Sequence, residues 1–256
     1  MTNHPPPPVL DWAWFFDIDG TLAQIEISPD AVRIDLVMQY LINELHDQSR
    51  CALALISGRA LHDIDKLFPN FKIAAAGQHG AERRNADGVI VRQPLPTPSL
   101  LAMRDGLREI ERRHHGLLLE DKGLSLALHY RQVPRLAFFV LREVRALFLQ
   151  MGPGFHMQTG KCVVEIVPVG HTKGTVITEF MTEHPFRGRV PAFLGDDVTD
   201  ENAFRVVNDL GGVSIKVGAG PTKAQHRLID VMAVRDWLTT LPTLTAVSLS
   251  DTEDNT

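Results

Sequence analysis

Cysteine and long apolar runs are both scarce in this sequence. Its 256 residues include two cysteines, Cys51 and Cys162, and no CxxC pair. A disulfide framework is therefore excluded by count, and no zinc motif is visible. Both cysteines lie in apolar, strand-like segments, so we expect buried core thiols. No apolar stretch reaches the roughly 18 residues that span a bilayer, and we expect no membrane partner.

A secretion signal and an excess of basic charge are also missing. Residues 1–8 lack the basic and apolar regions of a signal peptide, which predicts a cytoplasmic protein. The net charge of −5 argues against a broad surface for a nucleic-acid backbone, so we expect no nucleic-acid partner. Residues 1–11 are proline-rich and residues 247–256 are acidic, and we expect both tails to be disordered.

What the sequence does contain is an alternation of strands and helices. The apolar residues 12–16 predict a buried strand, and Ser28-Pro29-Asp30 predicts the capped start of an amphipathic helix that runs to Leu45. Residues 51–56 and 73–76 predict two further strands, separated by a helix that ends near Leu67. Strand, helix, strand, helix, strand indicates a parallel α/β unit.

The alternation is interrupted at Pro94, Pro96 and Pro98 and resumes near Lys173. Between them we expect helices over 100–114 and 136–149, with neighbouring strands over 117–120, 125–130 and 163–167 and near Phe155. After Lys173 we expect a helix to about Glu183, strands over 190–194 and 213–217, and a last helix over 222–228. The pattern predicts an α/β fold, a parallel Rossmann-like sheet flanked by helices. This core spans residues 12–93 and 169–246, and residues 94–168 form an inserted α+β cap domain.

The motif Asp17-Ile18-Asp19-Gly20-Thr21 directly follows the first strand. Two carboxylates two residues apart repel each other unless a cation or a reacting group makes use of them. In an open α/β sheet, chemistry gathers where the strands end at their carboxyl side. A polar turn without chemistry is the alternative for an isolated motif of this kind. A calcium-binding loop is excluded because its first ligand position would fall on Phe15.

Polar groups follow other predicted strand ends as well: Ser57, Asp196 with Asp197, and Lys173 at the start of the helix after the insert. Together with Asp17 they supply a nucleophile, a hydrogen-bond donor that can hold phosphate, and a positively charged side chain. A carboxylate nucleophile can divide phosphoryl transfer into two easier steps, and a second acid such as Asp19 can move the proton. The acids Asp17, Asp196 and either Asp197 or Asp200 suit Mg²⁺, a hard cation that prefers oxygen ligands.

These residues resemble the signature of the haloacid-dehalogenase superfamily of phosphatases. Within it, the sequence is similar to the trehalose-6-phosphate phosphatase family over residues 12 to 235. The similar segments are Ile56-Ser57-Gly58-Arg59, Ala76-Gly77-Gln78-His79-Gly80, Ser125-Leu126-Ala127-Leu128-His129-Tyr130-Arg131, Gly160-Lys161-x-x-Val164-Glu165 and Gly195-Asp196-Asp197-Val198-Thr199-Asp200-Glu201.

The resemblance implies a role for each matching residue. Asp17 corresponds to the nucleophile and Asp19 to the general acid/base. Asp17, the backbone carbonyl of Asp19, and Asp196 correspond to the Mg²⁺ ligands, with Asp197 and Asp200 as supporting acids. Ser57 and Lys173 correspond to the pair that binds the phosphoryl group. The other residues implied at the substrate are Gly58, Arg59, His79 and Gly80 in the core and Glu120, Lys122 and Glu165 in the cap.

The activity implied is hydrolysis of a disaccharide phosphate, trehalose 6-phosphate, with functional coupling to a trehalose-6-phosphate synthase. Two alternatives stay open: a phosphatase for sucrose or hexose phosphates on the same scaffold, and a catalytically silent protein that binds a sugar phosphate. For the cap residues, Glu120 and Lys122 could be solvated turn charges, and Glu165 could face water from an edge strand.

Overall fold

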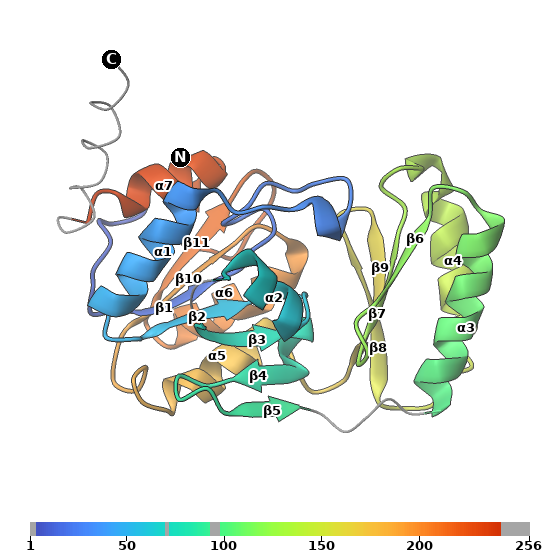
Figure 1. Cartoon of the computed structure of the whole chain (residues 1–256), viewed down its shortest axis with the longest axis horizontal. Coiled ribbons are helices and arrows are strands. Elements are labelled where there is room, and N and C mark those ends of the chain that lie inside the picture. The colour runs from blue at the N-terminus through green and yellow to red at the C-terminus, as the bar shows by residue number, and fades with distance from the viewer. Residues whose placement is uncertain (1–3, 70–71, 93–97, 242–256) are drawn as a thin grey trace, which may run out of the picture.

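The structure, a computed structural model, describes residues 4–69, 72–92 and 98–241. It contains an eight-stranded sheet and a four-stranded sheet in two neighbouring parts of an elongated molecule, and the four-stranded sheet lies between the larger part and the helices α3 (Pro98–Arg113) and α4 (Ala137–Phe148) (Figure 1). The large sheet consists of β1 (Ala13–Phe16), β2 (Leu53–Ile56), β3 (Ala74–Gly77), β4 (Glu82–Arg84), β5 (Ile90–Arg92), β10 (Pro191–Gly195), β11 (Val213–Val217) and β12 (His226–Leu228). The small sheet consists of β6 (Leu118–Asp121), β7 (Leu126–His129), β8 (Phe155–Gly160) and β9 (Val163–Pro168).

The large sheet has the order β12-β11-β10-β1-β2-β3-β4-β5 and is parallel from β12 to β3. Helices cover both faces: α1 (Leu36–Gln48), α2 (Leu61–Leu67) and α7 (Val231–Leu238) on one, α5 (Lys173–Met181) and α6 (Glu201–Asp209) on the other. Side chains of β1 alternate between the two faces, so Trp14 and Phe16 pack under the first set and Phe15 under the second. This confirms the predicted α/β core.

Strand β1 pairs with β2 on one side and with β10 on the other. The strands before the insert therefore extend the sheet from one edge of β1, and the strands after the insert extend it from the other edge. In parallel sheets such a point of reversal opens a crevice at the carboxyl ends of the strands. Asp17 and Asp196, which follow β1 and β10, lie at this crevice.

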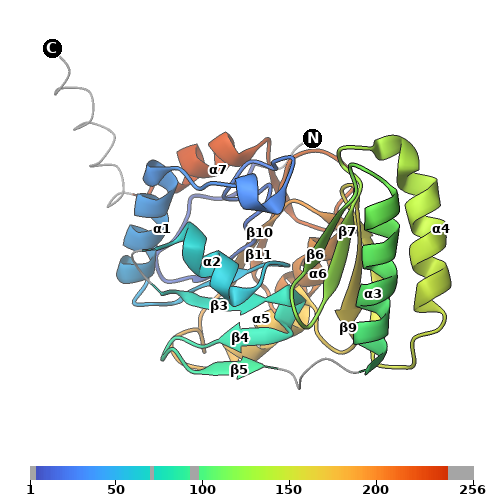
Figure 2. The same ribbon diagram turned by 45° about the vertical axis from the view of Figure 1, so that its right-hand side comes forward.

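The insert forms a cap in which the antiparallel sheet β6-β7-β9-β8 carries α3 (Pro98–Arg113) and α4 (Ala137–Phe148) on the face away from the core (Figure 2). Leu128, Val164 and Ile166 pack against these helices. Because side chains alternate along a strand, Glu165 between them faces the core instead. It lies on β9, an inner strand of this sheet, so it is not an edge residue facing water.

Two predicted helices are wrong in their position. The segment after Ser28 forms only a 3₁₀ turn, Pro29–Ala31, and the helix begins at Leu36, where the Asp35 carboxylate accepts from Met38 N over 2.8 Å. Val32 and Ile34 are buried in between, which keeps this stretch extended. The last helix was predicted over 222–228, but residues 226–228 form the edge strand β12, and the helix follows as α7.

The cysteines are not core thiols. Cys51 is exposed and Cys162 is partly exposed, and each has a positive φ (63° in both) in a turn that leads into a strand. Because Cys51 lies in this turn, the strand begins at Leu53 and not at residue 51 as predicted.

The pair β4–β5 was not predicted, and β4 consists of three charged residues. Glu82 and Arg84 are nevertheless buried, since each has a partner outside its own strand: Glu82 binds Arg92 at 3.0 Å, and Arg84 binds Asp65 at 2.7 Å. Buried charges that are paired in this way are tolerated in a sheet.

The chain ends and the domain boundary are partly outside the described residues. The proline-rich segment expected to be disordered is described from His4 onward, with Pro5 and Pro8 buried and Trp237 Nε1 donating to the Pro6 carbonyl over 2.9 Å. The predicted acidic tail and the boundary at residues 93 and 94 lie outside the described residues. Among the helices the structure describes, none has the length and apolarity needed to cross a membrane.

Candidate active site

The carboxyl ends of β1 and β10 bring together a buried cluster of acids and lysines. Lys173 begins α5 behind the N-cap Thr172, and its Nζ lies 2.7 Å from Asp17 Oδ1 and 2.6 Å from Asp200 Oδ1. Asp17, Asp196 and Asp200 each place one carboxylate oxygen within 4.8 Å of the others. Residues 17, 173 and 196, predicted from distant parts of the sequence, therefore form one site.

Burial and neighbouring charges act in opposite directions on the pKa values of Asp17 and Lys173. Burial raises the pKa of the Asp17 carboxyl well above its ordinary value; Lys173 opposes the rise, and Asp200 and Asp196 add to it. Burial alone would lower the pKa of Lys173, but Asp17 and Asp200 outweigh it and raise this pKa. The lysine is thus held as a cation between two carboxylates.

The donor set fits a hard divalent cation. It contains carboxylate oxygens only, which is the ligand type that Mg²⁺ prefers, and the three oxygens lie within 4.8 Å of one another. Asp200 already accepts from Lys173 and, through Oδ2, from the backbone N–H groups of Asp196 and Asp197 at 2.8 and 2.9 Å. Asp17 and Asp196 could therefore hold such a cation, and Asp200 orients the backbone of Asp196.

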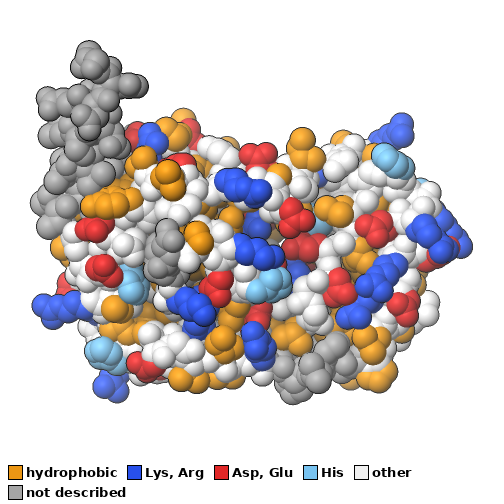
Figure 3. Space-filling model, in the orientation of Figure 1, with side chains coloured by type: hydrophobic (Ala, Val, Ile, Leu, Met, Phe, Trp, Pro, Cys, Tyr) orange, Lys and Arg blue, Asp and Glu red, His pale blue; other side chains and the backbone are white. Residues whose placement is uncertain are grey.

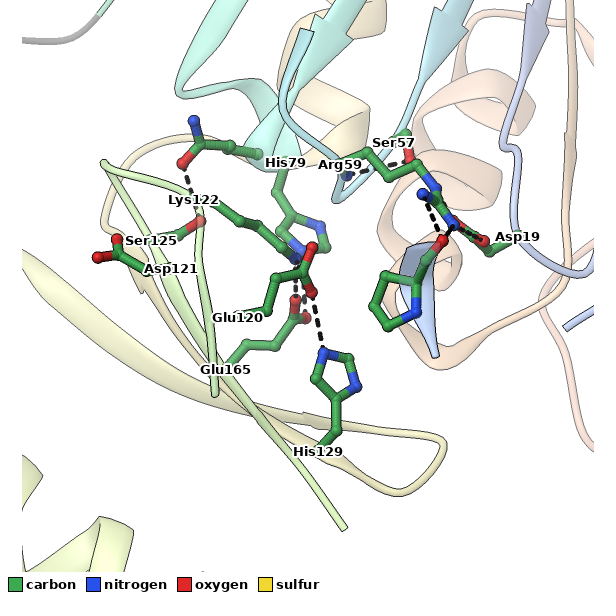
Figure 4. Close-up of polar contacts among 12 residues, drawn as sticks. Asp19, Ser57, Arg59, His79, Glu120, Asp121, Lys122, Ser125, His129 and Glu165 are labelled. Carbon is green, nitrogen blue, oxygen red and sulfur yellow. Dashed lines mark hydrogen bonds and ion pairs between the residues drawn. The ribbon is translucent and has the colours of Figure 1, made fainter. Parts of the chain in front are cut away.

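Asp19 lies at the side of the cavity and is held by Arg59 (Figure 4). The guanidinium donates to both carboxylate oxygens of Asp19 over 2.8 and 2.7 Å and also to the Pro29 carbonyl at 3.1 Å. A two-point contact of this kind fixes the orientation of a carboxylate. Arg59, predicted at the substrate, thus contacts the expected acid/base directly.

The loop after β2 supplies polar groups at the floor of the cavity. Ser57 is buried there, and its hydroxyl accepts from Arg59 N at 3.2 Å. Gly58 allows His79 to approach, since a Cβ on Gly58 would lie 2.8 Å from His79 Nε2. Gly80, also predicted at the substrate, packs instead against Val176 of α5 and is not among the residues that line this cavity.

The cap closes the cavity with a paired cluster of charges (Figure 4). Glu165 is 7% exposed and contacts Lys122 at 3.1 Å, His79 at 3.1 Å and Gln158 at 2.9 Å. Burial would raise the pKa of Glu165, but Lys122 and His79 outweigh it and hold this pKa well below its usual range. Glu120 accepts from His129 at 2.9 Å and faces the same space.

Core and cap residues together line a cavity of about 160 Å³. Its lining includes Asp17, Asp19, Ser57, Gly58, Arg59, His79, Glu120, Lys122, Lys161, Glu165, Lys173, Asp196 and Asp197. In the space-filling view, charged side chains of both signs and a histidine gather in the middle of the face shown, over the junction of core and cap (Figure 3). Such a lining suits a polar, anionic ligand.

Residues 15–232 match the family model described as trehalose-phosphatase. The chain belongs to the trehalose-phosphatase family. It is 45% identical to trehalose-6-phosphate phosphatase of Escherichia coli K12 over 91% of this chain and 87% of that protein. It is 39% identical to a probable trehalose-phosphate phosphatase of Sinorhizobium fredii over 85% of this chain and 82% of the relative.

Solved structures agree in fold. The C-terminal domain of a C. albicans trehalose-6-phosphate phosphatase superposes with a TM-score of 0.80 at 20% identity, covering 93% of this chain and 98% of the other. The resemblance to the trehalose-6-phosphate phosphatase family, noted in the sequence, is confirmed, and the chain is a phosphoric monoester hydrolase.

Three residues with clear contacts in this trehalose-phosphatase site received no role from the sequence. Lys216 of β11 is buried and donates to the Asp196 backbone carbonyl. Gln78 has a positive φ (50°), and its side-chain oxygen accepts from Ser125 of the cap at 2.9 Å. Lys161 of the cap contacts Asp196. A lysine inside the apolar strand 213–217 was the one visible signal, because a buried lysine requires a partner.

Gly20 provides a test of how tightly the motif is packed. Its φ is +85°, and a Cβ there would lie 2.1 Å from Asp196 Oδ2. We expect Gly20→Ala to displace Asp196 and to lower both the melting temperature and kcat, the latter by at least about tenfold. Gly88 is the matched control, with φ +81° and no atom near its Cβ position. Gly88→Ala should lower the melting temperature only; equal kcat for both variants would contradict the close packing.

Proposed function

We propose that this protein hydrolyses trehalose 6-phosphate to trehalose and inorganic phosphate, with Mg²⁺ as cofactor and an aspartyl-phosphate intermediate on Asp17. The observation that supports this most is the contact between the buried Asp17 carboxylate and Lys173 at the end of β1, beneath a polar cap. We take the identity of the substrate from the names of the two relatives. A trehalose-6-phosphate synthase would deliver that substrate, and we propose functional coupling to one.

In the first step, an oxygen of Asp17 attacks the phosphorus atom of the ester. The bond from phosphorus to the sugar oxygen breaks, its electron pair goes to that oxygen, and Asp19 in its acid form supplies the proton. Lys173, the Ser57 hydroxyl and nearby backbone N–H groups stabilise the negative charge on the other phosphoryl oxygens. The products of this step are trehalose and an acyl phosphate on Asp17.

In the second step, Asp19 now acts as a base. It takes a proton from a water molecule, whose oxygen attacks phosphorus, and the acyl phosphate bond breaks to release inorganic phosphate and the Asp17 carboxylate. Asp19 must reach the leaving oxygen and then the water, so it has to leave the two-point contact with Arg59 during the cycle. Arg59 therefore sets the resting position of the acid/base.

Asp17 and Asp196, with the backbone carbonyl of Asp19, would hold the Mg²⁺, and Asp200 and Lys216 keep Asp196 in place. The bound ion would neutralise part of the charge between the carboxylate nucleophile and the phosphate dianion. Turnover should therefore be lost in a chelator and return when Mg²⁺ is added. Turnover that persists in the chelator would contradict this cofactor assignment, and an inert, correctly folded chain would favour the silent sugar-phosphate-binding alternative.

A panel of phosphate esters tests the substrate. Phosphate release from trehalose 6-phosphate is compared with release from sucrose 6-phosphate, glucose 6-phosphate and mannose phosphates. We expect kcat/KM to be highest for trehalose 6-phosphate, because the acids and amides of the cap can accept hydrogen bonds from a neutral, hydroxyl-rich disaccharide. Equal values across the panel would favour the broader sugar-phosphate phosphatase.

Glu165→Gln separates sugar recognition from chemistry. The amide keeps the shape of the side chain but loses the charge that pairs with Lys122 and His79. We expect kcat/KM for the disaccharide phosphate to fall by about 10- to 100-fold, and kcat/KM for a small aryl phosphate to change by less than about threefold. A thermal melt checks that the fold is retained. Equal losses on both substrates would place Glu165 outside the sugar site.

A further inference from the structure

A buried glutamine of the core binds the turn between the cap strands β6 and β7. The side-chain oxygen of Gln78 accepts a hydrogen bond from Ser125 Oγ at 2.9 Å and another from Leu124 N at 3.2 Å. Gln78 and Ser125 are 3% and 2% exposed, and neither is among the residues that line the cavity. The contact therefore joins core and cap outside the space in which a substrate would bind.

The orientation of the Gln78 amide is set from the core side. Its nitrogen donates to Glu82 Oε1 at 3.2 Å, and the Glu82 carboxylate also accepts from Leu61 N at 2.7 Å and from Arg92 Nε at 3.0 Å. A carboxylate paired with a guanidinium group only accepts hydrogen bonds, so the amide nitrogen must face Glu82 and the amide oxygen must face the cap. The core thus presents a fixed acceptor to the cap.

The backbone of Gln78 and His79 ties this acceptor to the loop after β2. Both residues have a positive φ (50° and 58°), a left-handed conformation that is uncommon outside glycine. Gln78 N donates to the Arg59 carbonyl at 2.8 Å, and His79 N donates to the Ser57 carbonyl at 3.1 Å. With this backbone the side chains of both residues reach the cap, that of His79 at Glu165.

The turn that Gln78 binds also carries Lys122 (Figure 4). Lys122 N donates to the Ser125 carbonyl at 3.1 Å, which closes the turn. Lys122 Nζ lies 3.1 Å from Glu165 and 3.6 Å from Glu120, and all three of these charged side chains line the cavity. A bond that fixes the turn against the core therefore also fixes the position of Lys122 at the cavity.

The structure shows the cap in a closed position. The cavity of about 160 Å³ is smaller than the roughly 300–1,000 Å³ of typical small-molecule pockets. A disaccharide phosphate therefore requires the cap to move outward before it binds and to return around it. When the cap is outward, water can bind Leu124 N and Ser125 Oγ. The hydrogen bonds from these groups to Gln78 form only when the cap is closed.

We propose that Gln78 is a positioning residue, which holds the β6–β7 turn against the core when the cap closes over the disaccharide. Without its side-chain oxygen, Ser125 Oγ and Leu124 N would be buried without a partner in the closed position, and the equilibrium would shift toward the open cap. This inference rests on the proposed function, and it adds a residue that acts on recognition of the sugar from outside the cavity.

The first measurement is kcat/KM of Gln78→Leu, a variant that keeps the approximate size of the side chain but loses both hydrogen-bonding groups. We expect kcat/KM for trehalose 6-phosphate to fall by about tenfold, and kcat/KM for a small aryl phosphate to change by less than about threefold. The smaller ester does not need the turn that carries Lys122. Equal losses on both esters would place the effect on the loop of Ser57 and Arg59 and would overturn the proposal.

The second measurement is a double-mutant cycle with Ser125→Ala. This variant alone should lower kcat/KM for trehalose 6-phosphate by about threefold, because Gln78 still accepts from Leu124 N. In Gln78→Leu the serine hydroxyl is left unpaired, and Ser125→Ala removes it, so the double variant should be no slower than Gln78→Leu alone. Losses that multiply to about thirtyfold would show that the two side chains act independently. If Gln78→Leu does not fold, a loss on the disaccharide phosphate alone in Ser125→Ala decides the same point.

Ser214→Ala is the matched control. Ser214 is also buried, and its hydroxyl donates to the side-chain oxygen of Asn208 at 2.5 Å, but both residues lie in the core and outside the cavity lining. We expect a lower melting temperature and an unchanged kcat/KM for both esters. A loss confined to trehalose 6-phosphate in this variant would mean that general destabilisation reproduces the effect of Gln78→Leu, which would also overturn the proposal.

Failure of this inference and failure of the proposed function give different results. If the unaltered chain hydrolyses trehalose 6-phosphate best and Gln78→Leu matches it, the proposed function stands and the role of Gln78 is overturned. If the unaltered chain prefers another sugar phosphate, the proposed substrate is wrong, and the same cycle measured with the preferred ester still decides the role of Gln78.

Discussion

Asp17→Asn should reduce kcat by at least about 10⁴-fold, because the variant loses the only oxygen charge that can attack phosphorus in the proposed mechanism. The side chain keeps its size. Lys173 keeps its contact with Asp200 at 2.6 Å, so the buried ammonium is not left without a partner. We therefore expect the melting temperature to change by no more than a few degrees.

Phosphate release, a thermal melt and acid-quench trapping with labelled substrate check this prediction together. The unaltered chain should yield a labelled aspartate under turnover, and Asp17→Asn should yield none. Asp11→Asn is the control, since Asp11 is exposed, lies outside the cavity lining and pairs with Arg189 at 3.4 Å. Turnover by Asp17→Asn that a chelator still abolishes would place the nucleophile on another residue.

The parts of the fold and site that the sequence predicted are those set by short-range patterns. The strand before Asp17 is apolar on both sides because it is buried between two helical layers, and such a run is visible without any tertiary information. Asp17, Ser57 and Asp196 each follow such a strand. Because the carboxyl ends of parallel strands lie at one edge of the sheet, their closeness could be predicted from the sequence.

The parts that could not be predicted depend on partners that are distant in sequence. Arg59 and Asp19 are 40 residues apart, Ser125 and Gln78 are 47 apart, and Lys161 and Asp196 are 35 apart. Arg59 and Asp19 lie on the loops after two neighbouring strands of the core, β2 and β1, whereas the other two pairs join the cap to the core. Residue type alone cannot indicate which of several charged groups will meet.

Local signals also failed where tertiary packing outweighed them. Ser28 and Pro29 have the composition of a helix start, but burial of Val32 draws the next residues into an extended path toward the core, and Asp35 becomes the cap. The sequence of β4 is typical of a charged loop. In the structure, however, Glu82 accepts a hydrogen bond from Leu61 N at 2.7 Å and so joins the sheet to α2. In both places a long-range contact decides the conformation.

Asp19→Asn should be the second most damaging change, with kcat/KM for trehalose 6-phosphate lower by about 10²- to 10⁴-fold. The sugar leaves as an alcohol and needs a proton from Asp19 as its bond to phosphorus breaks. An aryl phosphate leaves as a stabilised phenolate and needs no such proton, so its first step should be far less affected. The second step needs Asp19 as a base for either substrate, because water must lose a proton.

The two roles of Asp19 therefore predict a distinctive time course. With an aryl phosphate, Asp19→Asn should release phenolate in a rapid burst equal to the enzyme concentration and then turn over slowly, with phosphorylated Asp17 recovered after acid quench. Arg59→Met is the control, because it removes the two-point contact at 2.8 and 2.7 Å but keeps the carboxyl group. It should lose less activity and show no burst. A uniform slowing of Asp19→Asn on both substrates, without any trapped phosphoenzyme, would mean that Asp19 only shapes the site, since loss of a proton carrier must slow the two steps unequally.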